Sequence, residues 1–287
     1  MAEFLVRGAF CNEWNFFPYM GVLARRAYHT RGKSMLNARQ LTKTYASVPA
    51  VENVTFNLDT GQVLGCLGPN GSGKSTTVKM LTGLLEPTRG SVLFAGEDIH
   101  RDLVGYRKCL GYVPEEPNLY PYLSGYEYLE MVGLLRGMPP ARIRKRVDAL
   151  LELFSLHASR HGSISSYSKG MRQRILLIAA LMDDPKILIF DEPMSGLDVT
   201  SALVLKNLIR ALGRQGRTVF YCSHVLEVVE QVCSHLLILR KGQVIACGPT
   251  SEIQNDRSSL ESRFMHLVEA GDTEKTARDI ISAMGEA

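Results

Sequence analysis

The stretch "VLGCLGPNGSGKST", residues 63 to 76, decides the fold of this chain. Its first five residues are apolar or small, which predicts a short buried strand that stops where the glycines begin. The following "TVKMLTGLL", residues 77 to 85, has helical spacing of its apolar residues. Residues 68 to 75 fit the pattern G-x-x-x-x-G-K-[ST] between a strand and a helix, and that context is typical of a phosphate-binding loop.

The residue types of this loop are suited to binding a nucleoside triphosphate. Glycines let backbone N–H groups converge on phosphate oxygens, and the next helix adds its positive N-terminal end. We expect Lys74 to reach the β- and γ-phosphates, Ser75 to coordinate Mg²⁺ and Thr76 to bond the α-phosphate. The predicted binding loop comprises Gly68, Pro69, Asn70, Gly71, Ser72, Gly73, Lys74, Ser75 and Thr76.

A second motif, "ILIFDEP" at residues 187 to 193, supplies the carboxylates that such a loop needs. Asp191 ends an apolar strand and can hold a Mg²⁺ ion, as the acid of a Walker B motif does. Glu192 follows and can polarise a water molecule in line with the γ-phosphate. The two motifs together predict a P-loop NTPase that uses Mg²⁺, but they do not say which one.

The composition agrees with a globular protein of the α/β class. The chain has 287 residues, 45% hydrophobic and 22% charged, with a net charge of +4, too small to argue for nucleic acid. No CxxC pair occurs, so neither a zinc site nor a disulfide framework is indicated. The longest apolar run, residues 175 to 182, is far shorter than the roughly 20 residues of a membrane span. At a membrane, another chain would therefore have to cross it.

Strands and helices alternate from Leu36 onwards, which favours a layered α/β fold. The pattern of residues 47 to 71 predicts short strands, and the patterns of residues 126 to 137 and 142 to 156 predict amphipathic helices. We divide the chain into an N-terminal extension (1–34), a nucleotide-binding domain (35–248) and a helical C-terminal tail (249–287). Two interpretations of residues 1–34 stay open: a disordered extension, or sequence ahead of a true start at Met35.

The order "GPNGSGKST … GYVPEE … YSKGMRQR … ILIFDEP … SGLD … SH" resembles the ATP-binding cassette (ABC) ATPases from about Leu36 to Gly248. The resemblance implies a P-loop core with a mixed, largely parallel sheet, an antiparallel β subdomain and an α-helical subdomain at about 116–182. "YSKGM" lies where the family keeps its signature, commonly LSGGQ. Ser168 and Gly170 keep the family residues, whereas Lys169 departs from them.

The signature residues predict a partner. Ser168 is a good N-cap for the helix that follows, and free N–H groups at a helix start bind anions. In the family this site faces the γ-phosphate of ATP held by the other subunit. The resemblance therefore implies two cassettes head to tail, either two copies of this chain or this chain with a related one.

Four further positions take family roles by resemblance. Tyr45 would stack on adenine, and Asp198 of "SGLD" would bridge the two protomers. His224 would contact the γ-phosphate and help to place Glu192 and the water. Glu115 stands where the family has a glutamine that joins the Mg²⁺ shell, and a carboxylate is also an oxygen ligand for Mg²⁺.

The resulting prediction is an ATP-hydrolysing subunit that powers a separate transmembrane permease, most simply an exporter, through ATP-driven dimerisation. It would be cytoplasmic, held at the inner face of the cell membrane by its permease, with no nucleic-acid partner. Two alternatives stay open: the ATPase subunit of an importer, and a soluble cassette ATPase acting on ribosomes or DNA. The transported substrate cannot be predicted from this chain, because the residues that contact it are in the permease.

Overall fold

The structure is a computed structural model that describes residues 34–254, 260, 264 and 281–284. Of the predicted N-terminal extension only Ser34 is described, and most of the predicted C-terminal tail lies outside the described residues. Within the described part of the chain, no helix is long and apolar enough to cross a membrane.

A six-stranded sheet forms the centre of the domain. Its neighbouring strands pair in parallel, apart from the antiparallel pair of the last two strands in the chain. Every residue of the three central strands is buried, which explains why they read as continuous apolar runs. The sheet order is β10 (Gln243–Pro249), β9 (His235–Arg240), β3 (Val63–Leu67), β8 (Thr218–Cys222), β7 (Ile187–Asp191) and β6 (Leu110–Val113).

A second sheet is antiparallel and has four strands, in the order β2 (Val48–Asp59), β1 (Ser34–Tyr45), β4 (Arg89–Phe94) and β5 (Glu97–Asp98). The prediction of only short strands before the phosphate loop was wrong, because β2 is one strand of 12 residues. Register shifts along its pairing with β1 let one strand continue through a locally irregular pattern.

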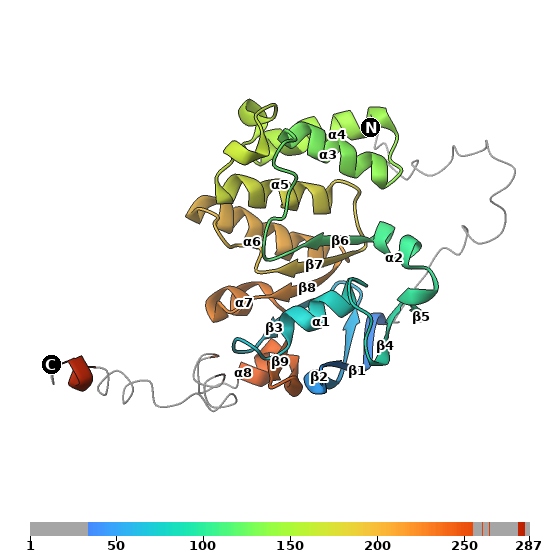
Figure 1. Ribbon diagram of the computed structural model, residues 1–287, viewed down its shortest axis with the longest axis vertical. Coiled ribbons are helices and arrows are strands. Elements are labelled where there is room, and N and C mark those ends of the chain that lie inside the picture. Colours follow the sequence, from blue (N-terminus) through green and yellow to red (C-terminus); the bar gives the residue numbers. More distant parts are fainter. Residues whose placement is uncertain (1–33, 255–259, 261–263, 265–280, 285–287) are drawn as a thin grey trace, which may run out of the picture. The chain divides into compact units, whose positions relative to one another are not determined.

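Helix α1 (Lys74–Leu81) lies between the two sheets (Figure 1). One buried apolar cluster joins this helix to the antiparallel sheet and to one face of the six-stranded sheet. The other face of that sheet is covered by α5 (Lys169–Leu181), α6 (Val199–Arg214) and α7 (Leu226–Val232). Both faces are thus covered, as a parallel sheet requires.

A helical layer lies beyond α5 and contains α3 (Gly125–Leu135) and α4 (Pro140–Leu153) (Figure 1). The two predicted amphipathic helices coincide with α3 and α4, which bury one face each in a third apolar cluster shared with α5. Helix α3 begins with a reciprocal capping box between Ser124 and Glu127. The P-loop core, the antiparallel β subdomain and the α-helical subdomain of the predicted fold are all confirmed. The remaining elements are the short helices α2 (Leu103–Cys109) and α8 (Thr250–Gln254) and three single-turn 3-10 helices at Ile99–Arg101, His157–Ser159 and Ile164–Ser166.

The contact between β6 and α5 allows no side chain at Gly111. A Cβ there would lie 2.5 Å from the Ala180 carbonyl oxygen and 2.7 Å from a Leu188 methyl carbon. We expect Gly111→Ala to lower the free energy of unfolding by about 1–3 kcal/mol, because the helix must shift away from the sheet. Urea denaturation measures this, with Gly248→Ala as the control, since its nearest neighbour would be 4.0 Å away. Equal stability of the two variants would contradict this account of the contact.

Candidate active site

Three parallel strands bring the predicted site residues together. Strands β3, β8 and β7 are neighbours in parallel register, so their carboxyl ends meet at one edge of the sheet. The phosphate loop follows β3, Glu192 follows β7, and Ser223 and His224 follow β8. A cavity of about 690 Å³ opens at this edge; it is lined by Ala50, Leu67, Gly68, Pro69, Asn70, Gly71, Ser72, Gly73, Lys74, Ser75, Thr76, Glu115, Asp191, Glu192, His224 and Phe264.

The loop itself is shaped by glycines that approach other backbone atoms. A Cβ at Gly68 would lie 2.4 Å from the Leu239 carbonyl oxygen. Gly73 has φ of +100° and caps α1, and a Cβ there would lie 2.7 Å from the Ala50 carbonyl oxygen. Both positions therefore require glycine, which brings the loop backbone close to the end of the sheet.

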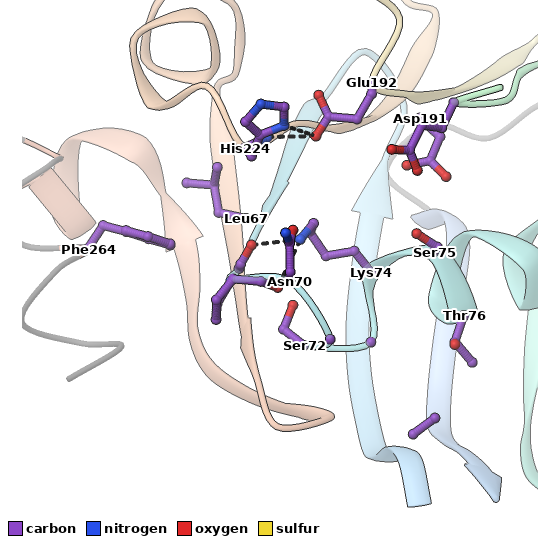
Figure 2. A pocket seen from close by; sticks show the side chains of 16 residues that line it. Leu67, Asn70, Ser72, Lys74, Ser75, Thr76, Asp191, Glu192, His224 and Phe264 are labelled. Atoms are coloured by element: carbon purple, nitrogen blue, oxygen red, sulfur yellow. Dashed lines mark hydrogen bonds and ion pairs between the residues drawn. The ribbon is translucent and has the colours of Figure 1, made fainter. Parts of the chain in front are cut away.

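The polar groups of the loop fit a phosphate chain. The Lys74 ammonium donates to the carbonyl oxygens of Gly68 (2.6 Å) and Pro69 (3.1 Å), so it lies over the loop (Figure 2). An ammonium has three donors, so one stays available to a phosphate oxygen. The buried Ser72 hydroxyl has no hydrogen-bond partner among the described residues, which is rare for a buried polar atom. A phosphate oxygen in the loop would supply a partner.

Acidic groups on the opposite wall fit a divalent cation. Burial and the negative charges of Glu115 and Glu192 together raise the pKa of Asp191 to about 6, although the positive charges of Lys74 and Lys79 act in the opposite direction. Among the described residues, no group of three or more His, Cys, Asp or Glu could hold a metal alone. Mg²⁺ commonly takes one or two carboxylates and completes its shell with substrate phosphates and water. Asp191, Glu115 and the Ser75 hydroxyl would hold it here.

Glu192 and His224 form the best-defined pair in the cavity (Figure 2). The Glu192 Oε1 atom lies 2.7 Å from His224 Nδ1 and accepts the His224 backbone N–H at 2.8 Å. The other carboxylate oxygen accepts from the Ser223 hydroxyl at 3.2 Å. Glu192 has φ of +47°, a left-handed conformation that is uncommon outside glycine and concentrates at functional sites.

The signature residues are not brought to this cavity within one chain. Ser168, Lys169, Gly170 and Asp198 are absent from its lining. Ser168 caps α5 through the Met171 N–H at 3.2 Å, as predicted from the sequence. The signature instead packs on the "SGLD" turn, residues 195 to 198, of the same chain. A Cβ at Gly196 would lie 2.8 Å from the Lys169 Cγ atom.

Tyr45 is also absent from the cavity lining. It ends β1, is 48% exposed, and lies with its ring centroid 5.8 Å from the Lys43 ammonium. The exposed ring face is compatible with stacking on a base, and its role in binding adenine stays a prediction.

Some residues of the site were not predicted from the sequence. Ser223 bonds Glu192, and its only signal was its place directly before His224. Ala50, Leu67 and Phe264 line the cavity without belonging to any motif. Phe264 lies in the predicted tail, far along the chain from the loop, and no local pattern could have placed it there.

The buried Asp191 carboxylate should destabilise the nucleotide-free protein. Its pKa in the folded state is about 6 against an ordinary 3.8, so folding disfavours the charged form above pH 6. At pH 7.5 with a chelator, we expect Asp191→Asn to raise the free energy of unfolding by on the order of 1–3 kcal/mol. The gain should fade as the pH falls from 6 towards 4, where both folded and unfolded states bind the proton.

Chemical denaturation over this pH range measures the effect. Asp148→Asn is the matched control, because Asp148 is an exposed residue of α4. If Asp191→Asn is no more stable than the parent protein at pH 7.5, the destabilisation by burial is refuted.

Comparison with known proteins agrees with this geometry. The family model described as ABC transporter matches residues 51–195. The ABC-type transporter ATP-binding protein EcsA of Bacillus subtilis is 34% identical over 82% of this chain and 96% of its own length. The Nod factor export ATP-binding protein I of Cupriavidus metallidurans is 34% identical over 88% of this chain and 82% of its own length.

Solved structures show the same fold. An ATP-binding subunit of an ABC transporter matches with a TM-score of 0.77 and 31% identity, over 82% of this chain and 99% of its own. A dimeric ATP-binding cassette in a post-hydrolysis state with bound ADP and Pi matches with a TM-score of 0.69 and 26% identity, over 76% and 99%. The loop, the acidic strand end and the glutamate–histidine pair thus lie on a cassette fold, and the chain belongs to the ABC transporter family as an ATP-binding, ATP-hydrolysing subunit.

Proposed function

We propose that this subunit powers an export permease, with Glu192 as the base that activates water and His224 as its partner. The observation that carries the chemistry is the 2.7 Å contact between Glu192 Oε1 and His224 Nδ1 in the cavity that also contains Lys74. A general base must lie within hydrogen-bond reach of the proton that it takes, and a carboxylate in the phosphate cavity meets that condition.

Hydrolysis would then proceed by attack of water on the γ-phosphate of ATP. The oxygen of a water molecule bonds the γ-phosphorus, the bond from that phosphorus to the bridging oxygen breaks, and the electron pair leaves with ADP. One water proton passes to Glu192, and inorganic phosphate is the second product. Lys74 and the backbone N–H groups of the loop stabilise the charge on the phosphate oxygens. A bound Mg²⁺ ion would supply further positive charge to the same oxygens.

We propose that two such subunits act together. Each chain has one phosphate loop and one signature helix start, and the two do not share a cavity within the chain. A two-fold, head-to-tail pair would place the signature of each subunit over the loop of the other. On this proposal Ser168, Lys169 and Gly170 contact the partner's nucleotide, and Asp198 bridges the protomers. The dimeric state of a similar cassette supports this arrangement.

Two observations support the proposed export direction and permease partner: the names of two relatives and an exposed aromatic segment. One relative of similar length is named for Nod factor export, and another, 36% identical, is the Linearmycin resistance ATP-binding protein LnrL of Bacillus subtilis. The segment between β6 and α3 also exposes aromatic side chains, with Tyr120 61% and Tyr122 94% accessible. We assign this segment to the permease contact, which would hold the subunit at the inner face of the cell membrane.

Substitution of Glu192 tests the chemistry. We expect Glu192→Gln to bind MgATP normally but to hydrolyse it about 100-fold more slowly, because an amide cannot take the proton. The variant should accumulate as an ATP-bound dimer in size-exclusion chromatography. Glu116→Gln is the matched control, since Glu116 is exposed and does not line the cavity. Turnover by Glu192→Gln at the parent rate would exclude Glu192 as the base.

Co-purification from the native host tests the partner. We expect the tagged chain, extracted from membranes in mild detergent, to retain a polytopic membrane protein in stoichiometric amount by mass spectrometry. Tyr122→Ala should reduce its recovery, whereas Leu153→Ala, which removes another exposed apolar side chain at the end of α4, should not. Recovery of ribosomal or DNA-bound partners without a membrane protein would contradict the transporter role.

A further inference from the structure

We propose that Ser223 is a positioning residue that selects which oxygen of Glu192 takes the proton from water. The inference rests on the proposed role of Glu192 as the base. It follows from a count of the donors around the two carboxylate oxygens, which leaves a free acceptor position on Oε2 alone.

The first oxygen, Oε1, is fully occupied. It accepts the backbone N–H of His224 at 2.8 Å and lies 2.7 Å from Nδ1 of the same residue. An ionised carboxylate only accepts hydrogen bonds, so Nδ1 carries the hydrogen in this contact. Each carboxylate oxygen has about two lone-pair positions. Both positions of Oε1 are therefore taken by one histidine.

The second oxygen, Oε2, keeps one position free. It accepts the Ser223 hydroxyl at 3.2 Å, and no other donor to it exists among the described residues. Glu192 lines the phosphate cavity with its side chain 13% exposed, so water reaches the carboxylate from that side. The remaining lone pair of Oε2 is the position from which Glu192 can take a proton.

Ser223 is itself held in one orientation. It is 2% exposed, and its Oγ accepts the Val225 backbone N–H at 3.1 Å. Because the carboxylate cannot donate, the serine hydrogen points to Glu192, while one lone pair of Oγ accepts the Val225 N–H. The donor of the hydroxyl and one of its acceptor positions are thus used, which favours a single orientation of the Ser223 side chain.

The location of Ser223 separates positioning from substrate contact. Its side chain is buried behind Glu192 and does not line the cavity. Loss of its hydroxyl should therefore leave nucleotide binding intact. It should instead free the Oε2 end of the carboxylate to rotate away from the water, which lowers the rate of the chemical step.

Steady-state kinetics and ATP binding of the full chain test this inference. We expect Ser223→Ala to lower kcat about ten-fold, within the range for a hydrogen bond to a charged group, with KM and Kd for MgATP unchanged. Ser223→Thr retains the hydroxyl and should restore most of the rate. Ser234→Ala is the matched control, because the Ser234 hydroxyl bonds Val63 at the opposite end of β3.

A double-mutant cycle with Glu192→Gln decides the mechanism. In the Glu192→Gln background, Ser223→Ala should have no further effect, since its only target has been removed. An unchanged kcat in Ser223→Ala, a rise in KM without a fall in kcat, or independent effects of the two substitutions would each overturn the proposal. Rapid turnover by Glu192→Gln would instead show that the proposed base is wrong. A soluble, ATP-binding Ser223→Ala protein excludes misfolding as the cause of a lower rate.

Discussion

The whole site depends on the parallel pairing of β3, β8 and β7. Parallel strands end at the same edge, so the residues that follow them meet without any long-range signal of their own. The pairing aligns Cys66 with Cys222 and Cys222 with Asp191, all buried. One residue of slip in either pair would move a carboxylate or the phosphate loop by a full residue along the strand and turn its side chain to the other face.

The second constraint is electrostatic. Asp191 is buried near two other carboxylates, which raises its pKa, and the lysine charges offset this only in part. In the protein without ligand this arrangement opposes folding, yet it favours a divalent cation. Stability and function therefore make opposite demands on the same residue, as is common where an active site is buried.

The signature helix and the catalytic turn are linked within one chain. The buried amide of Gln173 donates to the Pro193 carbonyl oxygen at 3.0 Å, directly after Glu192. A Cβ at Gly170 would lie 2.6 Å from the Gly196 carbonyl oxygen, so helix and turn are in close contact. In the proposed dimer, a displacement of the signature by a partner's nucleotide would reach the turn that follows Glu192 through these contacts. The two ATP sites of a dimer would then be mechanically coupled.

Local patterns in the sequence determined the strand–loop–helix unit, the acidic strand end and the helix start at Ser168. Each depends on neighbours within a few residues, since glycines shape a loop and a side-chain oxygen caps a helix wherever they occur. The division into two sheets and the antiparallel subdomain came from the family resemblance, because strand order depends on contacts between distant segments. Only the tertiary structure placed Ser223 behind Glu192 and Phe264 at the cavity. These placements depend on packing between elements far apart in the chain, which no local pattern encodes.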